Sequence, residues 1–271
     1  MSAPIYITTP DSPYLEPYRD LKRKGRSNSS LAVIAEGEIV LQRAFSSDWS
    51  LQSVLATPAK FERLRASIPA DTQVYLADQR LLQNLLGFKF HRGCLACVNP
   101  KPPLNIEDFI SNKLPKFVLG LSQVTDPRNI GSIFRIGAAF GADLILLDPE
   151  CSDPLSRMVA RVSMGTLFHI PFSIAPFEDS LEKFRKNGPN RQMVVATTPN
   201  PSGIAIHDIK WCDTNILIFG NEGQGLRPNI IAQCDIESFI PISSDFDSIN
   251  VANAASICAY EVRKHLSLTS N

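Results

Sequence analysis

The fold is decided by residues 116–148, KFVLGLSQVTDPRNIGSIFRIGAAFGADLILLD, which hold two apolar runs on either side of a helical pattern. KFVLGLS at 116–122 is apolar on both faces and predicts a buried strand. The stretch 129–141 predicts a helix that ends at Gly141, and DLILLD at 143–148 predicts the next strand. An apolar strand, a crossover helix and a second apolar strand indicate a parallel pair.

The same alternation continues to the end of the chain. Three further apolar runs of strand length follow, MVVATT at 193–198, NILIFG at 215–220 and SFIPI at 238–242, and a long helix is expected over 249–265. Strands that are apolar on both faces are typical of a parallel sheet covered by helices. The second part of the chain is therefore predicted to be an α/β domain.

A linker-like stretch separates this domain from what precedes it. VNPKPPLNIEDFISN at 98–112 contains three prolines and few apolar residues. We therefore predict a first domain over 1–104, a linker over 105–113 and the α/β domain over 114–271.

The first domain is predicted to be small and of mixed α/β type. Its expected elements are a basic helix at 17–26, a pair of strands at 31–45 around Glu36-Gly37, a helix at 56–66, a strand at 72–77, a helix at 78–87 and a strand at 94–98.

Composition narrows the class of protein. The 271 residues are 44% hydrophobic and 20% charged, with no apolar run of 18, which excludes a membrane span. The N-terminal stretch has neither a basic start nor an apolar core, so we expect no secretory signal and a cytoplasmic protein. Net charge is zero, but residues 1–100 carry 12 basic against 9 acidic side chains, and residues 101–271 carry 15 against 18. A surface that binds a polyanion is thus expected in the first domain.

Six cysteines include one C-x-x-C pair, Cys94 and Cys97. Zinc would need a second pair of ligands at a suitable spacing, and none follows. The pair lies in an apolar run that predicts a strand, so we interpret both as small buried thiols and expect no metal. A chain without a disulfide framework also fits a reducing compartment.

Three polar or glycine-rich loops follow predicted strands, where ligands bind in a parallel sheet. In the first loop, Arg128 and Arg135 place positive charge near the start of a helix, which suits a phosphate. The alternative is that Asn129 only caps this helix and Arg135 is a solvated surface residue.

The second loop, NILIFGNEGQGLRP, has the glycine spacing G-x-x-G-x-G. This spacing differs from both the dinucleotide fingerprint and the phosphate loop. Glu222 at its centre would repel phosphates and suits a cationic or hydroxyl-bearing ligand. The alternative is a glycine-rich turn with an exposed acid.

The third loop, SFIPISSDFDSINVANAASICAYE, leads into the last helix. Ser248 is expected to cap that helix. Small residues on it, Ala252, Ala254, Ala255, Ser256 and Ala259, allow a close approach of either another chain or another helix of the same chain.

Together the three loops resemble the three motifs of the SpoU (TrmH) family of RNA 2′-O-ribose methyltransferases, in the SPOUT superfamily. The matching stretches are N-x-G-S-x-x-R at 129–135, F-G-N-E-G-x-G-L at 219–226 and I-P-I-x-x-x-x-x-S-I-N-V-A-x-A at 240–254. The resemblance covers about residues 115–265. More weakly, the first domain is similar to the RNA-substrate-binding domain that precedes the catalytic domain in this family.

The resemblance implies a deep C-terminal trefoil knot, a homodimer, S-adenosylmethionine as cofactor, tRNA or rRNA as substrate, and no metal or membrane. The residues that match the family's catalytic positions are Asn129, Arg135, Glu222, Ser248 and Asn250. Those that match its cofactor positions are Phe219, Gly220, Asn221, Gly225, Leu226, Ile240, Ile242, Ile249 and Asn250. An arginine is an awkward base, because its pKa is about 12.5–13.8. The resemblance therefore implies that Arg135 orients the ribose hydroxyl and its phosphate.

Two departures from the family pattern affect the third loop. It has S-I-N-V-A where S-L-N-V-S is usual, and Ser244 replaces a common glycine. A second hypothesis is a catalytically inactive RNA-binding or ribosome-associated protein of the same fold. A nucleotide-dependent oxidoreductase is excluded by the glycine spacing.

Recruitment of RNA is expected to fall to the basic segment of the first domain. On a helix, Arg19, Arg23 and Arg26 would share one face. The predicted RNA-binding residues are Arg19, Lys22, Arg23, Lys24, Arg26 and Arg128. The alternative is a solvated helix face.

Overall fold

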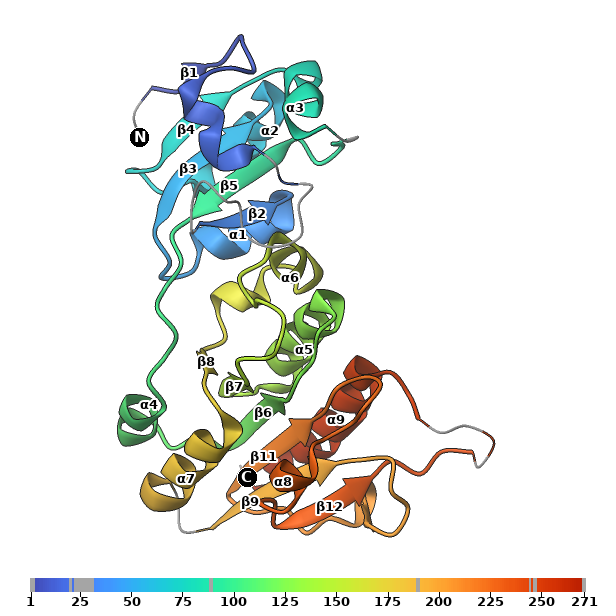
Figure 1. Ribbon diagram of the computed structural model, residues 1–271. Coiled ribbons are helices and arrows are strands. Elements are labelled where there is room, and N and C mark those ends of the chain that lie inside the picture. Colours follow the sequence, from blue (N-terminus) through green and yellow to red (C-terminus); the bar gives the residue numbers. More distant parts are fainter. Residues whose placement is uncertain are drawn as a thin grey trace. The chain divides into compact units, whose positions relative to one another are not determined.

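The computed structural model describes residues 3–19, 21, 32–87, 90–188, 191–243, 245 and 248–269 (Figure 1). The chain divides into two compact units, one of Met1–Pro102 with Asp153–His169 and one of Pro103–Ser152 with Ile170–Asn271. The first unit therefore includes a segment from within the stretch predicted as the second domain. The boundaries of the functional domains, 1–104, 105–113 and 114–271, stay a prediction.

The second unit is built on a seven-stranded sheet in the order β10-β12-β9-β11-β6-β7-β8. Every neighbouring pair in it is parallel. Its strands are β6 (Phe117–Leu121), β7 (Leu144–Leu147), β8 (Phe172–Ile174), β9 (Gln192–Thr197), β10 (Ile204–Ala205), β11 (Thr214–Phe219) and β12 (Ile236–Phe239). The predicted α/β fold with a parallel sheet is confirmed.

Helices cover both faces of this sheet, as strands without a polar face require. On one face, α4 (Ile106–Asn112), α7 (Phe177–Asn187) and α8 (Pro228–Ile231) pack on a core that includes Val194, Ala196, Ile216 and Ile218. The remaining two helices, α5 (Pro127–Phe140) and α9 (Val251–Thr269), pack against each other, and α9 also contacts β11.

Most of the stretch 105–113, which is predicted as a linker, forms the helix α4. Asn105 caps α4 by accepting a hydrogen bond from the Glu107 amide at 2.9 Å. Ile106 and Ile110 are buried in the core beside Phe177. The three prolines precede this helix, so they mark the end of the first unit and not a structureless connection.

The first unit contains a five-stranded mixed sheet in the order β1-β4-β3-β5-β2. Strands β1, β4 and β3 are parallel, whereas β5 runs antiparallel to both β3 and β2. Its elements are β1 (Ile5–Tyr6), η1 (Pro13–Tyr18), β2 (Val33–Glu36), α1 (Glu38–Phe45), β3 (Leu51–Ala56), α2 (Pro58–Leu64), η2 (Arg65–Ser67), β4 (Gln73–Leu76), α3 (Gln79–Leu86) and β5 (Cys94–Val98).

The pair of strands expected around Glu36-Gly37 is a strand followed by a helix. Gly37 has φ +93° and turns the chain directly from β2 into α1. Val40, Leu41 and Ala44 are buried, at the spacing of one helix face. The run EIVLQ misled the sequence-based prediction because a short apolar run suits a strand and a buried helix equally.

The segment Asp153–His169 supplies α6 (Arg157–Val162) and η3 (Thr166–Phe168) to the first unit. Helix α6 packs against β2, and Arg157 Nη1 lies 3.0 Å from Glu36 Oε2. Arg43 Nη1 donates to the Met164 carbonyl at 2.8 Å.

The connection from β10 to β11 contains η4 (Ile206–Asp208), which contacts α9. The final helix begins at Val251 and not at Ile249 as predicted.

Candidate active site

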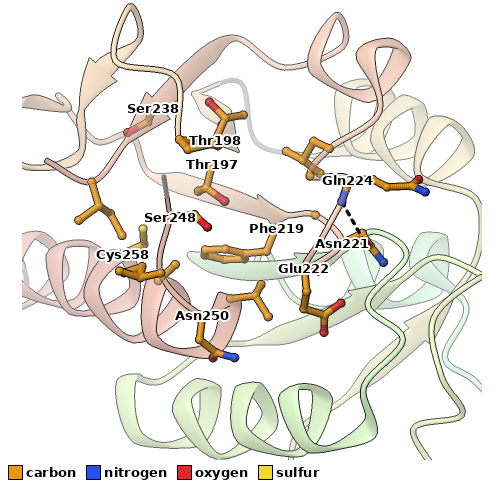
Figure 2. Close-up of a pocket in the computed structure, with 18 of the residues that line it drawn as sticks. Thr197, Thr198, Phe219, Asn221, Glu222, Gln224, Ser238, Ser248, Asn250 and Cys258 are labelled. Atoms are coloured by element: carbon orange, nitrogen blue, oxygen red, sulfur yellow. Dashed lines mark hydrogen bonds between the residues drawn. The ribbon is translucent and has the colours of Figure 1, made fainter. Parts of the chain in front are cut away.

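A cavity of 520 Å³ lies in the second unit, beside the carboxyl ends of β9 and β11 and the start of α9 (Figure 2). It is lined by residues from three segments: 197–199, 219–226 with 231, and 237–258. The named lining residues are Thr197, Thr198, Pro199, Phe219, Gly220, Asn221, Glu222, Gly223, Gln224, Gly225, Leu226, Ile231, Glu237, Ser238, Ile240, Ile242, Ser248, Ile249, Asn250, Val251, Ala254 and Cys258. The structure therefore brings the second and third predicted loops together.

The loop after β11 is folded tightly on itself. The backbone amides of Asn221 and Gly225 each donate to the other residue's carbonyl, at 3.0 and 2.9 Å. A Cβ at Gly220 would lie 2.2 Å from the Gly225 carbonyl carbon, so no side chain fits there. The need for glycine at 220 thus comes from the loop's own backbone.

Gly225 is different from Gly220. It has φ +70°, and a Cβ there would have no heavy atom within 4 Å. This residue leaves open space on the lining of the cavity, where a ligand can approach the backbone closely.

A chain of polar side chains connects all three predicted loops. Asn250 Nδ2 donates to Asn129 Oδ1 at 3.1 Å, and Asn129 Nδ2 donates to Glu222 Oε1 at 2.6 Å. In Figure 2, the labelled Glu222 and Asn250 side chains both point toward the helix that carries Asn129. Asn129 is nearly buried, with 9% of its surface exposed, so these contacts fix its amide.

Asn250, and not Ser248, caps the last helix. Its Oδ1 accepts the Ala252 amide at 2.9 Å and its carbonyl accepts the Ala254 amide at 2.9 Å. Ser248 lies two residues earlier, is exposed and lines the cavity.

Three isoleucines that line the cavity are partly or largely open to solvent. Ile242 is 40% exposed and Ile249 is 36% exposed, and Ile240 is half-buried. Apolar side chains left open beside a few convergent polar groups are typical of a small-molecule site.

The two arginines of the first loop do not line this cavity. Arg135 is exposed on α5, six positions after Asn129. Arg128 is 73% exposed and its Nη2 lies 2.7 Å from Asp126 Oδ2. Its hydrogen bond with Asp126 raises the pKa of the Arg128 guanidinium. Asp126 also caps α5, which is therefore not the function of Asn129.

The sequence analysis did not predict the side of the cavity that is lined by residues at or next to β9 and β12 and by α9. Thr197, Thr198, Glu237, Ser238 and Cys258 all line the cavity. The Thr198 hydroxyl donates to Glu237 Oε1 at 2.6 Å. The position of the two threonines, directly after an apolar run that predicts a strand, was the available signal.

Of the predicted RNA-binding residues, Lys22, Arg23, Lys24 and Arg26 lie outside the described residues. Arg19 follows η1 in an extended conformation (φ −82°, ψ 159°), so the helix does not continue through it as predicted. Its side chain contacts its own unit, with Nη2 2.6 Å from the Pro10 carbonyl and Nε 3.2 Å from Glu16 Oε2.

The small residues of α9 are mostly turned inward. Ala252, Ala255 and Ala259 are buried, which agrees with close packing of α5 on α9 within one chain. Among the side chains of α9 whose burial is described, the exposed apolar ones are Ile257, at 41%, and Tyr260, at 56%.

Cys94 and Cys97 lie in β5 and both are buried. Burial raises the pKa of Cys94 to about 11 and that of Cys97 to about 12. Both are therefore thiols near neutral pH, as a structural role requires.

In the described part of the chain, no group of three or more His, Cys, Asp or Glu side chains is arranged to hold a metal ion. No helix in the same residues is long and apolar enough to cross a membrane.

The sequence matches the family model described as the SpoU rRNA Methylase family over residues 116–260. It is 30% identical to the 23S rRNA (guanosine-2′-O-)-methyltransferase RlmB of Acinetobacter baylyi, over 73% of this chain and 81% of that protein. It is also 29% identical to an uncharacterized tRNA/rRNA methyltransferase of Mycobacterium tuberculosis, over 94% of this chain and 90% of that one.

A solved structure resembles the whole chain. The AdoMet-bound rRNA methyltransferase from Sinorhizobium meliloti superposes with a TM-score of 0.83 at 25% identity, over 96% of this chain and 98% of that one.

Proposed function

Because the chain belongs to the SpoU rRNA methylase family, we propose that it methylates a ribose 2′-hydroxyl of tRNA or rRNA with S-adenosylmethionine as cofactor. The observation that carries this proposal is the hydrogen-bonded series Asn250–Asn129–Glu222, which joins the three motif loops beside one cavity. The general activity, methyl transfer to RNA, is that of the family. The ribose 2′-hydroxyl is the finer part of the proposal, supported by the name of the Acinetobacter relative.

The residues that line the cavity fit this cofactor. Exposed Ile242 and Ile249 offer an apolar surface for the adenine ring. Because Gly225 has no side chain, the cofactor can approach its backbone closely. Backbone groups at Gly220, Ile240 and Ile249 would hold the adenine and ribose. The remaining expected cofactor positions, Phe219, Asn221, Leu226 and Asn250, also line the cavity. When bound, S-adenosylmethionine supplies a methyl group on a sulfonium, an activated form that needs no metal.

The polar series would position the reacting groups. Asn129 holds Glu222 Oε1 at 2.6 Å, so the carboxylate presents a fixed acceptor at the edge of the cavity. Such an acceptor orients a ribose hydroxyl, and Ser248 and Asn250 add further polar groups. Arg135 would orient the hydroxyl and its phosphate, since a group with a pKa of about 12.5 or more is a poor base.

A homodimer is part of the proposal, with a second copy of this chain on α5 and α9. Ile257 and Tyr260 are exposed on α9, and Ala138 and Ala139 are exposed on α5. Arg135 lies on the same face of α5 as Ala138 and Ala139. A monomeric mass by light scattering at micromolar concentration would contradict this part.

The first unit would bind the RNA, and the C-terminal segment would form the family's trefoil knot. The second and third motif loops, which would hold the cofactor in that knot, line one cavity. A cytoplasmic location also stays a prediction.

Methyl transfer from radiolabelled S-adenosylmethionine to unmodified tRNA and rRNA tests the proposal. Alkaline hydrolysis follows, since a methylated 2′-hydroxyl protects the adjacent phosphodiester. Labelled, alkali-resistant dinucleotides are the expected result. Tight cofactor binding without any transfer, on RNA from a deletion strain, would favour the inactive RNA-binding protein.

A further inference from the structure

We propose that Asp148 is a positioning residue that holds residues 220–227, the cofactor loop, in its binding shape. Asp148 lies outside all three motif stretches, directly after β7. The proposal rests on the proposed function, because it assigns a cause to the geometry of the same cavity.

The first contact is inside the cofactor loop. Asn221 Oδ1 accepts the amides of Gly223 and Gln224 at 2.8 and 3.0 Å. The Asn221 side chain is therefore the inner support of the turn that carries Glu222. Whatever fixes Asn221 fixes this turn.

Asn221 is fixed in turn by Gln123. Its Nδ2 donates to the Gln123 carbonyl at 2.8 Å. Gln123 has φ +55°, a left-handed conformation that is unfavourable for a residue with a side chain. The Gln123 amide donates to Asp148 Oδ2 at 3.0 Å, which stabilises that conformation and aims the carbonyl at Asn221.

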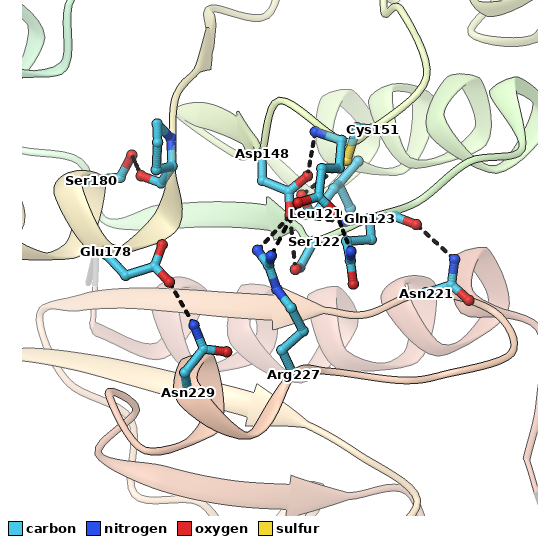
Figure 3. A network of polar contacts seen from close by, with 12 residues as sticks. Leu121, Ser122, Gln123, Asp148, Cys151, Glu178, Ser180, Asn221, Arg227 and Asn229 are labelled. Atoms are coloured by element: carbon cyan, nitrogen blue, oxygen red, sulfur yellow. Dashed lines mark hydrogen bonds and ion pairs between the residues drawn. The ribbon is translucent and has the colours of Figure 1, made fainter.

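The second contact is at the other end of the cofactor loop. Arg227 Nη2 lies 3.3 Å from the same oxygen, Asp148 Oδ2, and its Nη1 lies 3.2 Å from Glu150 Oε1. Figure 3 shows Arg227 reaching toward Asp148, with Asn221 directed at Gln123. One carboxylate oxygen therefore holds both the start and the end of the loop.

Burial makes these contacts strong. Asp148 is 1% exposed, and its Oδ2 also accepts the Ser122 hydroxyl at 2.9 Å, while Oδ1 accepts the Glu150 amide at 3.0 Å. Hydrogen bonds to a buried charged group are stronger than neutral ones. An asparagine carries no charge, so it would weaken the hydrogen bond from Gln123 and the ion pair with Arg227 whichever way its amide is turned.

The first experiment compares Asp148→Asn with a matched variant at the opposite end of the same strand. Asp143 is also a shielded carboxylate; it accepts the Lys116 and Phe117 amides at 2.8 and 3.1 Å and pairs with Lys113. It precedes β7, whereas the cavity lies at the carboxyl ends of the strands. Calorimetry should show the Kd for S-adenosylmethionine raised about tenfold in Asp148→Asn and unchanged in Asp143→Asn.

Steady-state kinetics separate positioning from general instability. In Asp148→Asn the KM for the cofactor should rise while kcat at saturating cofactor stays within about twofold, because bound cofactor restores the loop. A folded Asp148→Asn variant with the wild-type Kd would overturn the proposal.

A backbone test covers the case in which Asp148→Asn does not fold. Gln123→Gly keeps the amide and carbonyl and adopts φ +55° freely, whereas Gln123→Val is strained there. The proposal requires a higher cofactor Kd in the Val variant than in the Gly variant. Equal values for the two would contradict it.

Hydrogen exchange distinguishes failure of this inference from failure of the proposed function. The amides of Gly223 and Gln224 should exchange faster in Asp148→Asn than in Asp143→Asn, with no ligand present. Unchanged exchange would refute the positioning by Asp148, even if S-adenosylmethionine binds. Faster exchange in a chain that binds no S-adenosylmethionine would leave Asp148 as the loop support and reject the cofactor.

Discussion

Among the residues that the structure describes, each unit contains one buried carboxylate paired with arginine, and the two carboxylates differ in what they hold. Glu36, 4% exposed, contacts Arg157 at 3.0 Å and Arg92 at 3.6 Å in the first unit. Asp148, 1% exposed, contacts Arg227 at 3.3 Å in the second unit.

The partners explain the difference. Glu36 pairs with Arg157 of the segment Asp153–His169, so it attaches a distant stretch of chain to β2. Burial lowers the pKa of the Arg157 guanidinium, and the nearby Glu36 carboxylate opposes that shift. Asp148 instead binds backbone amides next to a cavity. The same chemical pair thus stabilises a packed unit in one place and shapes a loop in the other.

The largest expected effect separates catalysis from cofactor binding within the second unit. Arg135→Ala should lower methyl transfer by about 10²–10³-fold, as expected when a charge-stabilising group is removed. The cofactor Kd should stay near wild type, because Arg135 does not line the cavity. Single-turnover rates and calorimetry measure the two quantities.

Arg128→Ala is the comparison for Arg135→Ala, with both rates measured at saturating RNA because Arg128 is itself a predicted RNA-binding residue. It removes an exposed arginine of the same helix, but one that is paired with Asp126. A near-normal single-turnover rate in Arg135→Ala would reject its catalytic role.

The next effect tests the loop that Asp148 supports. Gly220→Ala should destabilise the protein and weaken cofactor binding together, since its Cβ would meet the Gly225 backbone at 2.2 Å. Gly225→Ala has room for its Cβ, so it should lower the free energy of unfolding by only about 1–2 kcal/mol, because an alanine is strained at a positive φ. Thermal unfolding with and without cofactor compares them, and equal losses of stability would contradict the distinction.

Glu36→Gln is the corresponding change in the first unit. Removing the buried negative charge that pairs with the half-buried Arg157 should lower the free energy of unfolding by about 1–3 kcal/mol. Cofactor affinity should not change, because Glu36 belongs to the other unit. Denaturant titration measures the stability of Glu36→Gln, and calorimetry measures its cofactor Kd. A raised cofactor Kd in this variant would contradict the proposed difference between Glu36 and Asp148.

The smallest expected effect concerns RNA recruitment by the first unit. Replacing Lys22, Arg23 and Lys24 by Ala should flatten the salt dependence of RNA binding, by about 0.7 in slope for each phosphate contact. Arg19→Ala should change the salt dependence of RNA binding less, because the Arg19 guanidinium is already engaged by Glu16 and the Pro10 carbonyl. Wild-type affinity and slope in the triple variant would exclude the basic segment as the recruiting surface.

The sequence predicted the parallel sheet of the second unit, whereas in the first unit it predicted a strand where α1 lies. The long apolar runs of the second unit have a single stable arrangement, a parallel sheet between helices. In the first unit, the sequence of residues 38–42 is compatible with either a strand or a helix. The helix is favoured because it buries Val40, Leu41 and Ala44 together. The sequence did not predict α4 for a similar reason. Prolines at 100–103 indicated a loop, and the burial of Ile106 and Ile110 beside Phe177 can be seen only in the tertiary structure.

For the site, the sequence by itself identified Asn129, Glu222 and Asn250 as candidate polar residues, because the spacing of residues within a motif is local. Only the tertiary structure decided that these three side chains form one hydrogen-bonded series, and that Asp148 and Gln123 stand behind the cofactor loop. It also decided that the small residues of α9 pack inward and that Asp153–His169 joins the first unit. The physical reason is that these hydrogen bonds join residues 25 to 121 positions apart, and hydrogen bonds at such separations depend on how the strands and helices pack.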